Sequence, residues 1–255
     1  MFAPRAVAVV GFKDAGKTRV VEALVGELTR RGLRVGTLKH APRDRLLDTP
    51  GKDTARHREA GSVASAILTS EGAAVFLNHP LSVADAVTGL GPVDIVIMEG
   101  FKSLDTVARI VVPRTAEEVE KLANGLEIAV SGPSVEEVSD LDVPFVPLTS
   151  VGELADIVET RGFPLLPGLN CGGCGYDGCG GLARAILAGE AKVERCVNYS
   201  AGAVRLRVDG RAVALNPFVQ EVLRNMILGM VRALKGIEEP GRVELALEAG
   251  GEEDG

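Results

Sequence analysis

The chain has 255 residues, of which 46% are hydrophobic and 25% charged, ordinary values for a globular protein that argue against extended disorder. Its 35 acidic and 28 basic side chains give a formal net charge of -7 at pH 7, which argues against general nucleic-acid binding. No apolar run approaches the ~20 residues that a membrane-spanning helix needs, so we expect a cytoplasmic protein without a membrane partner.

The first predicted strand, residues 5–10, leads into the sequence G-F-K-D-A-G-K-T at residues 11–18. This sequence fills the Walker A spacing G-x-x-x-x-G-K-[ST], and a helical pattern follows at residues 17–31. In such loops the backbone N–H groups and Lys17 bind phosphates, and the Thr18 hydroxyl ligates Mg²⁺. Lys13 can instead be a solvated side chain that does not contact the nucleotide. The predicted nucleotide-binding residues here are Gly11, Lys13, Asp14, Ala15, Gly16, Lys17, Thr18 and Arg19.

A second predicted strand, residues 33–38, ends in Lys39 and His40. Open α/β sheets bind ligands outside the carboxyl ends of their strands, so we expect this pair to face the phosphate loop and to join the nucleotide-binding residues. His40 can equally be an ordinary polar surface residue without a role in binding. Residues 30–58 contain nine Lys or Arg against three Asp, and charge runs of this kind are usually solvated faces.

The apolar run at residues 92–100 predicts a buried strand that ends in an acid, as Walker B elements do. Glu99 lies at the carboxyl end of this strand, near the phosphates, whereas Asp94 lies at the other end. Glu99 is therefore the predicted second Mg²⁺ ligand. Either Glu99 or Asp53 orients the water of the metal, and Asp53, in the loop and short helix expected at residues 51–61, can instead cap the helix. The predicted catalytic residues are Lys17, Glu99 and Asp53.

Strand and helix patterns alternate through the first two thirds of the chain. Strands are expected at residues 63–68, 73–77, 107–112 and 127–131, with a short one near 145–146, and helices at 115–123 and 150–160. This alternation predicts an α/β fold of the P-loop NTPase type, with a mostly parallel sheet flanked by helices. The alternating pattern of strands and helices ends at the Pro- and Gly-containing residues 164–168. We therefore predict a nucleotide-binding domain at residues 1–163 and a small α+β domain at residues 164–255.

All four cysteines lie close together, in the pattern Cys171-x₂-Cys174-x₄-Cys179-x₁₆-Cys196. In a reducing compartment such a cluster indicates metal binding rather than disulfides. Four thiolates are the usual ligands of a 4Fe-4S cluster, and the glycines of this loop let backbone N–H groups approach the sulfurs. A structural zinc site and a pair of disulfides are the alternatives.

After the cysteine loop at residues 170–196, a hairpin and a helix are expected within residues 201–248. Two short apolar segments flank the turn pair Asp209-Gly210, and Asn216-Pro217 begins a helix that runs to about residue 235. The Met and Leu stripe of this helix predicts a core face or a dimer seam. We also expect a strand at residues 242–247 and a disordered tail at residues 250–255.

Four blocks together resemble the MobB family: the phosphate loop, the Lys39-His40 pair, G-K-D-T-A-R-H-R-E-A-G at residues 51–61 and V-I-M-E-G-F-K at residues 96–102. The resemblance implies a GTP-binding adapter with weak Mg²⁺-dependent GTPase activity, forming a homodimer. It also implies a partner, the molybdenum cofactor guanylyltransferase that attaches GMP to molybdopterin. The guanine assignment comes from the resemblance alone, because no N-K-x-D motif occurs. Arg19-Val20 depart from the Thr and Leu that the family often has there.

The cysteine segment resembles the four-cysteine 4Fe-4S module of RnfB-type electron-transport subunits and corrinoid iron-sulfur proteins. Two functions follow from the combination. The first is an adapter of molybdenum or tungsten cofactor biosynthesis with a 4Fe-4S appendage, in which the basic residues 30–58 could also dock an anionic molybdopterin phosphate or an acidic partner. The second is a nucleotide-driven protein of metallocofactor maturation or electron delivery.

Overall fold

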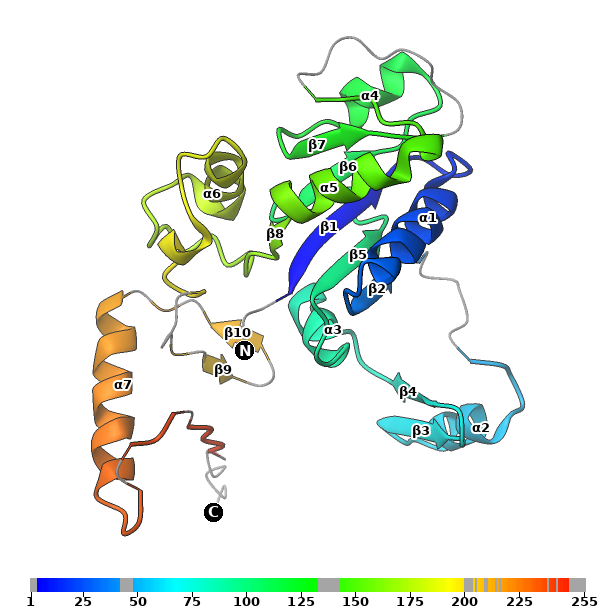
Figure 1. The fold of residues 1–255 in the computed structure, drawn as a ribbon. Helices are drawn as coiled ribbons and strands as arrows, with labels where there is room; N and C mark the ends of the chain where they lie inside the picture. Colours follow the sequence, from blue (N-terminus) through cyan, green and yellow to red (C-terminus); the bar gives the residue numbers. More distant parts are fainter. Residues whose placement is uncertain are drawn as a thin grey trace.

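A computed structural model gives the fold (Figure 1) and describes residues 4–41, 48–132, 143–199, 204, 206–208, 211–213, 215, 217–237, 239–241 and 243–247. Its central sheet has five parallel strands in the order β2-β5-β1-β6-β7, and the short strand β8 pairs antiparallel with β1. The strands are β1 (Arg5–Val10), β2 (Val35–Lys39), β5 (Ile95–Glu99), β6 (Ala108–Val111), β7 (Glu127–Val130) and β8 (Phe163–Pro164).

Helices cover both faces of this sheet. Helices α1 (Lys17–Arg30) and α5 (Val151–Arg161) share one buried cluster with Val7 and Val9 of β1. Helices α3 (Val83–Gly89) and α4 (Ala116–Leu122) share the other cluster with the alternate residues of β1. Because both faces are covered, the central strands are mostly apolar, with Arg109 of β6 as a buried exception. The predicted class, a mostly parallel sheet flanked by helices, is confirmed.

The predicted elements recur with small shifts of their ends. The short strand expected near residues 145–146 is reduced to a single parallel bridge between Phe145 and Val130, just before the short 3-10 helix η1 (Leu148–Ser150). Helix α3 is an addition that the sequence patterns did not predict. The predicted domain boundary falls inside β8, and this division of the chain stays a prediction.

An arm extends from the sheet between β2 and α3 (Figure 1). It consists of helix α2 (Asp53–Glu59) and the antiparallel strands β3 (Ala64–Leu68) and β4 (Ala73–Leu77), which pair only with each other among the described strands. The helix and both strands were predicted, but their separation from the central sheet was not. Residues 42–47, which include part of the basic segment, lie outside the described residues.

The C-terminal part contains α6 (Gly178–Leu187), the 3-10 helix η2 (Val193–Arg195), the hairpin β9 (Leu206–Val208) with β10 (Arg211–Val213), and α7 (Pro217–Arg232). The hairpin and the helix were predicted, whereas the turn pair Asp209-Gly210, the cap Asn216 and the tail 250–255 lie outside the described residues. The strand predicted at 242–247 is wrong, since the described residues 243–247 have no regular structure. Among the described helices, none has the length and apolar character to cross a membrane.

Candidate functional site

The phosphate loop joins the end of β1 to the start of α1, at the carboxyl edge of the sheet. Its backbone takes the left-handed conformation at Asp14 (φ 62°) and at Gly16 (φ 91°), and the amide of Ala15 donates to the carbonyl of Phe12 over 3.4 Å. A Cβ atom at Gly11 would lie 2.4 Å from the carbonyl oxygen of Val112. The loop therefore needs glycine at position 11 for packing and at position 16 for its backbone angle.

Lys17 stands at the first position of α1 and bends back over the loop. Its Nζ donates a hydrogen bond of 2.6 Å to the carbonyl oxygen of Phe12. Burial lowers the pKa of Lys17 below its ordinary value, and Glu99 opposes this shift, while the charges of Lys102 and Lys39 add to it. The nearby cations make this end of the loop a favourable place for an anion.

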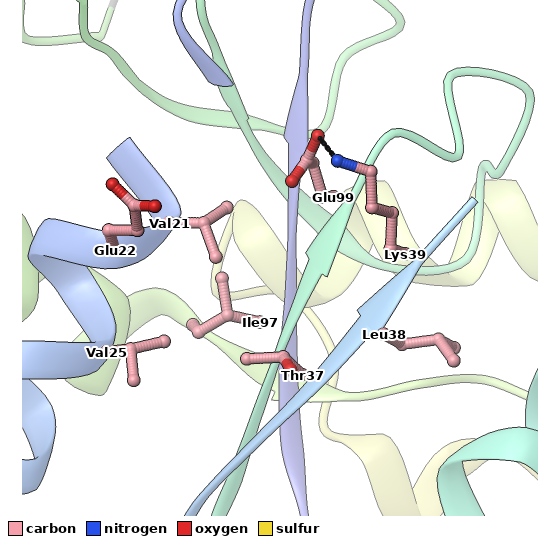
Figure 2. Close-up of a pocket in the computed structure, with 8 residues that line it drawn as sticks. All are labelled: Val21, Glu22, Val25, Thr37, Leu38, Lys39, Ile97 and Glu99. Carbon is pink, nitrogen blue, oxygen red and sulfur yellow. Dashed lines mark hydrogen bonds and ion pairs between the residues drawn. The ribbon is translucent and has the colours of Figure 1, made fainter. Parts of the chain in front are cut away.

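The carboxylate of Glu99 contacts two of the predicted site residues. The Thr18 hydroxyl donates to Glu99 Oε1 over 3.2 Å, and Lys39 Nζ forms an ion pair of 2.7 Å with the same oxygen (Figure 2). Lys39 and Glu99 are direct partners across β2 and β5, so both side chains emerge at one edge of the sheet. The backbone amide of His40 donates to the Glu99 carbonyl, but its ring lies against the ring of Phe101.

A cavity of about 300 Å³ adjoins this carboxylate, between α1 and the edge strand β2 (Figure 2). Most of its wall is apolar, and the ion pair of Lys39 and Glu99 forms its polar end. The lining residues are Val21, Glu22, Val25, Thr37, Leu38, Lys39, Ile97 and Glu99. The same two charged groups that approach Thr18 therefore line a space large enough for part of a ligand.

The structure does not bring every predicted residue to this place. Lys13, Asp14 and Arg19 are exposed around the loop. Asp53 opens α2 in the arm (Figure 1), its side chain is 89% exposed, and its ionic contact is Arg56 at 4.0 Å.

Sequence reasoning missed one basic group at the phosphate loop. It also counted the cations of residues 30–58 without the acids that pair with several of them. Lys102 was not assigned a role, although it belongs to the V-I-M-E-G-F-K block, and its Nζ lies 4.1 Å from the centre of the Phe12 ring. Several cations of residues 30–58 are paired with acids: Arg30 and Arg31 with Glu27, Arg34 with Asp94, and Arg58 with Asp48. These pairs leave less free positive charge for docking than the residue count suggests.

The four cysteines lie on the loop before α6, in α6 and after η2. Cys171 is exposed, Cys174, Cys179 and Cys196 are buried, and none of these described thiols is in a disulfide. Burial raises the pKa of the Cys196 thiol. Among the described residues, no three His, Cys, Asp or Glu side chains are gathered closely enough to be recognised as a site for a metal ion.

Three polar side chains that sequence reasoning missed hold this cysteine loop. The side-chain oxygen Oδ1 of Asn170 accepts from the backbone amide of Cys179 over 2.7 Å, and Arg195 Nε donates to the backbone carbonyl of Cys174 over 3.0 Å. Asn198 Nδ2 lies 3.1 Å from Cys171 Sγ. Their only sequence signal is their position within two residues of a cysteine. Four soft thiolate donors on a loop held by such contacts suit an iron-sulfur cluster by their chemistry.

Comparison with known proteins gives relatives for the whole chain. The family model "Molybdopterin guanine dinucleotide synthesis protein B" (MobB) matches residues 6–131. A "Putative molybdopterin-guanine dinucleotide biosynthesis adapter protein" of Methanocaldococcus jannaschii is 26% identical over 96% of this chain and 97% of its own length. A "Probable molybdopterin-guanine dinucleotide biosynthesis adapter protein" of Bacillus subtilis is 31% identical over 46% of this chain and 69% of its own length. The crystal structure of Bacillus subtilis MobB has the same fold, with a TM-score of 0.53 at 24% identity over 61% of this chain and 96% of that one.

The cysteine segment has separate relatives. A family model described as "Putative Fe-S cluster" matches residues 166–197. One component of an ion-translocating oxidoreductase complex of Cereibacter sphaeroides is 59% identical over 32 residues, which are 12% of this chain and 17% of that component. Both resemblances that the motifs indicate, to MobB and to the RnfB-type module, are thereby confirmed.

Proposed function

The chain belongs to the MobB family, and from that premise we propose that it is a GTP-binding adapter of molybdopterin-guanine dinucleotide biosynthesis that carries a 4Fe-4S cluster. The observation that supports nucleotide binding most directly is the contact of Thr18 and Lys39 with Glu99 at the mouth of the Walker A loop. The match to an adapter protein over 96% of the chain supports the adapter role. Its partner is then the guanylyltransferase that attaches GMP to molybdopterin, and molybdopterin itself is a candidate ligand.

In this proposal each residue of the loop has one task. Lys17 exchanges the carbonyl of Phe12 for oxygens of the β- and γ-phosphates, beside the loop amides. Thr18 and Glu99 hold Mg²⁺, which neutralises phosphate charge, and Lys39 fixes the carboxylate of Glu99. Asp53 is exposed in the arm (Figure 1) and does not reach Glu99 in a single copy, so it would not orient an attacking water there, which fits weak GTP hydrolysis.

In the C-terminal part, Cys171, Cys174, Cys179 and Cys196 are the proposed ligands of the 4Fe-4S cluster. The bound cluster supplies one-electron redox chemistry. A second function, nucleotide-driven metallocofactor maturation or electron delivery, gains support from the packing of α6 on the core of the nucleotide-binding part, where Leu182 and Ala183 join the cluster that contains α1. Tighter binding of ATP than of GTP would favour this second function.

One sample tests both ligand sites. We expect anaerobically purified protein to be brown, to contain about four iron atoms per chain, and to bind GTP in a calorimetric titration with Mg²⁺. Lys17→Ala should lose GTP binding and keep its iron. Glu99→Gln should lose only the part of the affinity that depends on Mg²⁺. A colourless protein with one zinc ion per chain would refute the iron-sulfur proposal, and wild-type protein that does not bind GTP would refute the nucleotide proposal.

A further inference from the structure

Asn198 is a buried side chain whose amide faces a cysteine sulfur. It is only 7% exposed, and its Nδ2 lies 3.1 Å from Cys171 Sγ. Cys171 is the exposed member of the four cysteines. A buried amide is costly unless it is hydrogen-bonded, so this contact accounts for the burial of the Asn198 amino group.

Gln220 fixes the orientation of Asn198 from another element. This residue lies in the first turn of α7, is 8% exposed, and its Nε2 faces Asn198 Oδ1 at 3.5 Å. The same Nε2 donates to the carbonyl oxygens of Val197 and Leu215, each over 3.1 Å. Because Oδ1 of Asn198 faces a donor, its Nδ2 is left to face the sulfur. Helix α7 is therefore tied to the segment that follows Cys196.

We infer that Asn198 donates a hydrogen bond to the cluster ligand Cys171 and that Gln220 is the positioning residue for this bond. The position of α7 then sets the reduction potential of the cluster. This inference rests on the proposed iron-sulfur function. Hydrogen bonds to cluster sulfurs stabilise the more negative, reduced state and therefore raise the potential. No electron acceptor or chemical step beyond reduction of the cluster is implied.

The position of α7 makes such a link useful. Its first turn is anchored through Gln220, while Val222, Met226 and Met230 are exposed farther along the helix. A second copy of the chain bound to this apolar face would contact the same helix that Gln220 anchors. Through two consecutive side-chain contacts, it would change the hydrogen bond at the most accessible sulfur of the site.

The test is an anaerobic redox titration of the full chain, followed by electron paramagnetic resonance, with iron content measured on each sample. We expect Asn198→Ala, Asn198→Asp and Gln220→Ala to shift the potential to more negative values at unchanged iron content. The double variant Asn198→Ala with Gln220→Ala should shift it no further than Asn198→Ala alone, since both remove one bond. The matched control is Asn225→Ala, an exposed amide on the same helix, which should titrate like wild type.

Three results would overturn the inference. A potential of Asn198→Ala equal to that of wild type, with the iron retained, would refute it and leave the proposed function standing. Additive shifts in the double variant would show that Gln220 does not act through Asn198. If Asn198 variants lose their iron, Gln220→Ala decides the question alone, because it keeps Asn198. Wild-type protein without iron would remove the proposed function and the inference together.

Discussion

A single methyl group at position 11 is enough to disturb the phosphate loop. In Gly11→Ala the new Cβ would meet the Val112 carbonyl oxygen at 2.4 Å, and this obstacle is a backbone atom and not the end of a flexible side chain. Overpacking of this kind costs about 1–3 kcal/mol. If that strain is relieved by moving the loop, GTP affinity should fall by about 5- to 150-fold, which a calorimetric titration measures.

The matched control lies on the helix that follows the loop. A Cβ at Gly26 in α1 would have no neighbour within 4 Å, so Gly26→Ala should stabilise the helix by about 0.5–1 kcal/mol and leave GTP affinity unchanged. Thermal unfolding reports the first effect and calorimetry the second. Equal GTP affinities for Gly11→Ala and Gly26→Ala would show that the loop tolerates a side chain at its entrance.

Among individual residues, the sequence predicts those that belong to a motif or that stand at the carboxyl end of a strand. Lys17 and Thr18 come from the Walker A spacing, and Glu99 and Lys39 from the rule that parallel strands end at one edge. Asn198 escaped notice because its contact with Cys171 depends on how the chain returns after η2, which no local pattern encodes.

Between elements, the first and the fifth helix are joined by a cluster of charges around Arg31. Its guanidinium binds Glu27 on α1 and both Asp156 and Glu159 on α5. Hydrogen bonds from Arg30 and Arg31 lower the pKa of Glu27 from an ordinary 4.5 to about 2. Because the pKa is lower in the folded state, ionised Glu27 stabilises the fold above pH 4.5, and this stabilisation is lost as the pH falls toward 2.

This linkage predicts a pH-dependent difference between wild type and Glu27→Gln. At pH 7 the variant should unfold at a lower temperature, and the difference should shrink as the pH falls from about 4.5 and be gone near 2. Thermal unfolding followed by circular dichroism over this range measures it at low salt, since salt screens exposed charges. A difference that is constant with pH would assign the effect to packing and not to charge.

Helix α7 carries the apolar face for which the sequence predicted a core or a dimer seam. Its exposed apolar residues repeat every four positions, at Phe218, Val222, Met226 and Met230, and Leu234 continues this spacing just beyond the end of the helix. A second copy fits this face. An apolar face of this length that stays exposed in one copy is what an interface between two copies would cover.

We therefore expect the homodimer implied by the family resemblance to use this face. Light scattering after size-exclusion chromatography should give a dimer for wild type and a monomer for Met226→Glu, because the pairing would bury the new carboxylate without a partner. Asn225→Glu, which adds the same charge at an exposed neighbour, should remain a dimer. A dimeric Met226→Glu would place the interface elsewhere.

Helices and strands with a clear local sequence pattern were predictable, whereas weakly patterned elements and the separation of the arm from the central sheet were not. The strands β1 and β5 are nearly continuous apolar runs, as expected of strands covered on both faces, whereas β6 carries the buried Arg109. Helix α3 was missed because four of its seven residues, Val83, Val87, Thr88 and Gly89, have low helix propensity, whereas the equally short α4 consists mostly of strong helix formers. The apolar segments at residues 63–68 and 73–77 indicate β3 and β4 as strands, but they cannot show that these strands leave the central sheet.

In the molecule as a whole, the phosphate loop and the cysteine loop lie at opposite ends of the sheet (Figure 1). The segment 101–106 runs between them. Near the phosphate loop, Lys102 stacks on the ring of Phe12, and at the other end the Thr106 carbonyl accepts from the amide of Leu166. The buried guanidinium of Arg109 holds the middle of this segment, by hydrogen bonds to the carbonyls of Lys102 and Leu104.

Two neighbouring glycines of α6 allow this connection to be tested. A Cβ at Gly180 would lie 2.6 Å from Asp105 Oδ2, whereas a Cβ at Gly181 would have its nearest neighbours at 3.6 Å, an ordinary contact. Gly181→Ala should therefore stabilise α6 by about 0.5–1 kcal/mol. Gly180→Ala gains the same helix propensity but must displace Asp105, so it should not raise the unfolding temperature.

If segment 101–106 couples the two ends, Gly180→Ala should also act at a distance. We expect faster hydrogen exchange in residues 102–106 and a lower GTP affinity, with iron content unchanged, because the displaced Asp105 shifts the segment that carries Lys102. Gly181→Ala should match wild type in exchange and in affinity. Faster exchange without any loss of GTP affinity would mean that the contact only docks α6, and that the nucleotide and the cluster act independently.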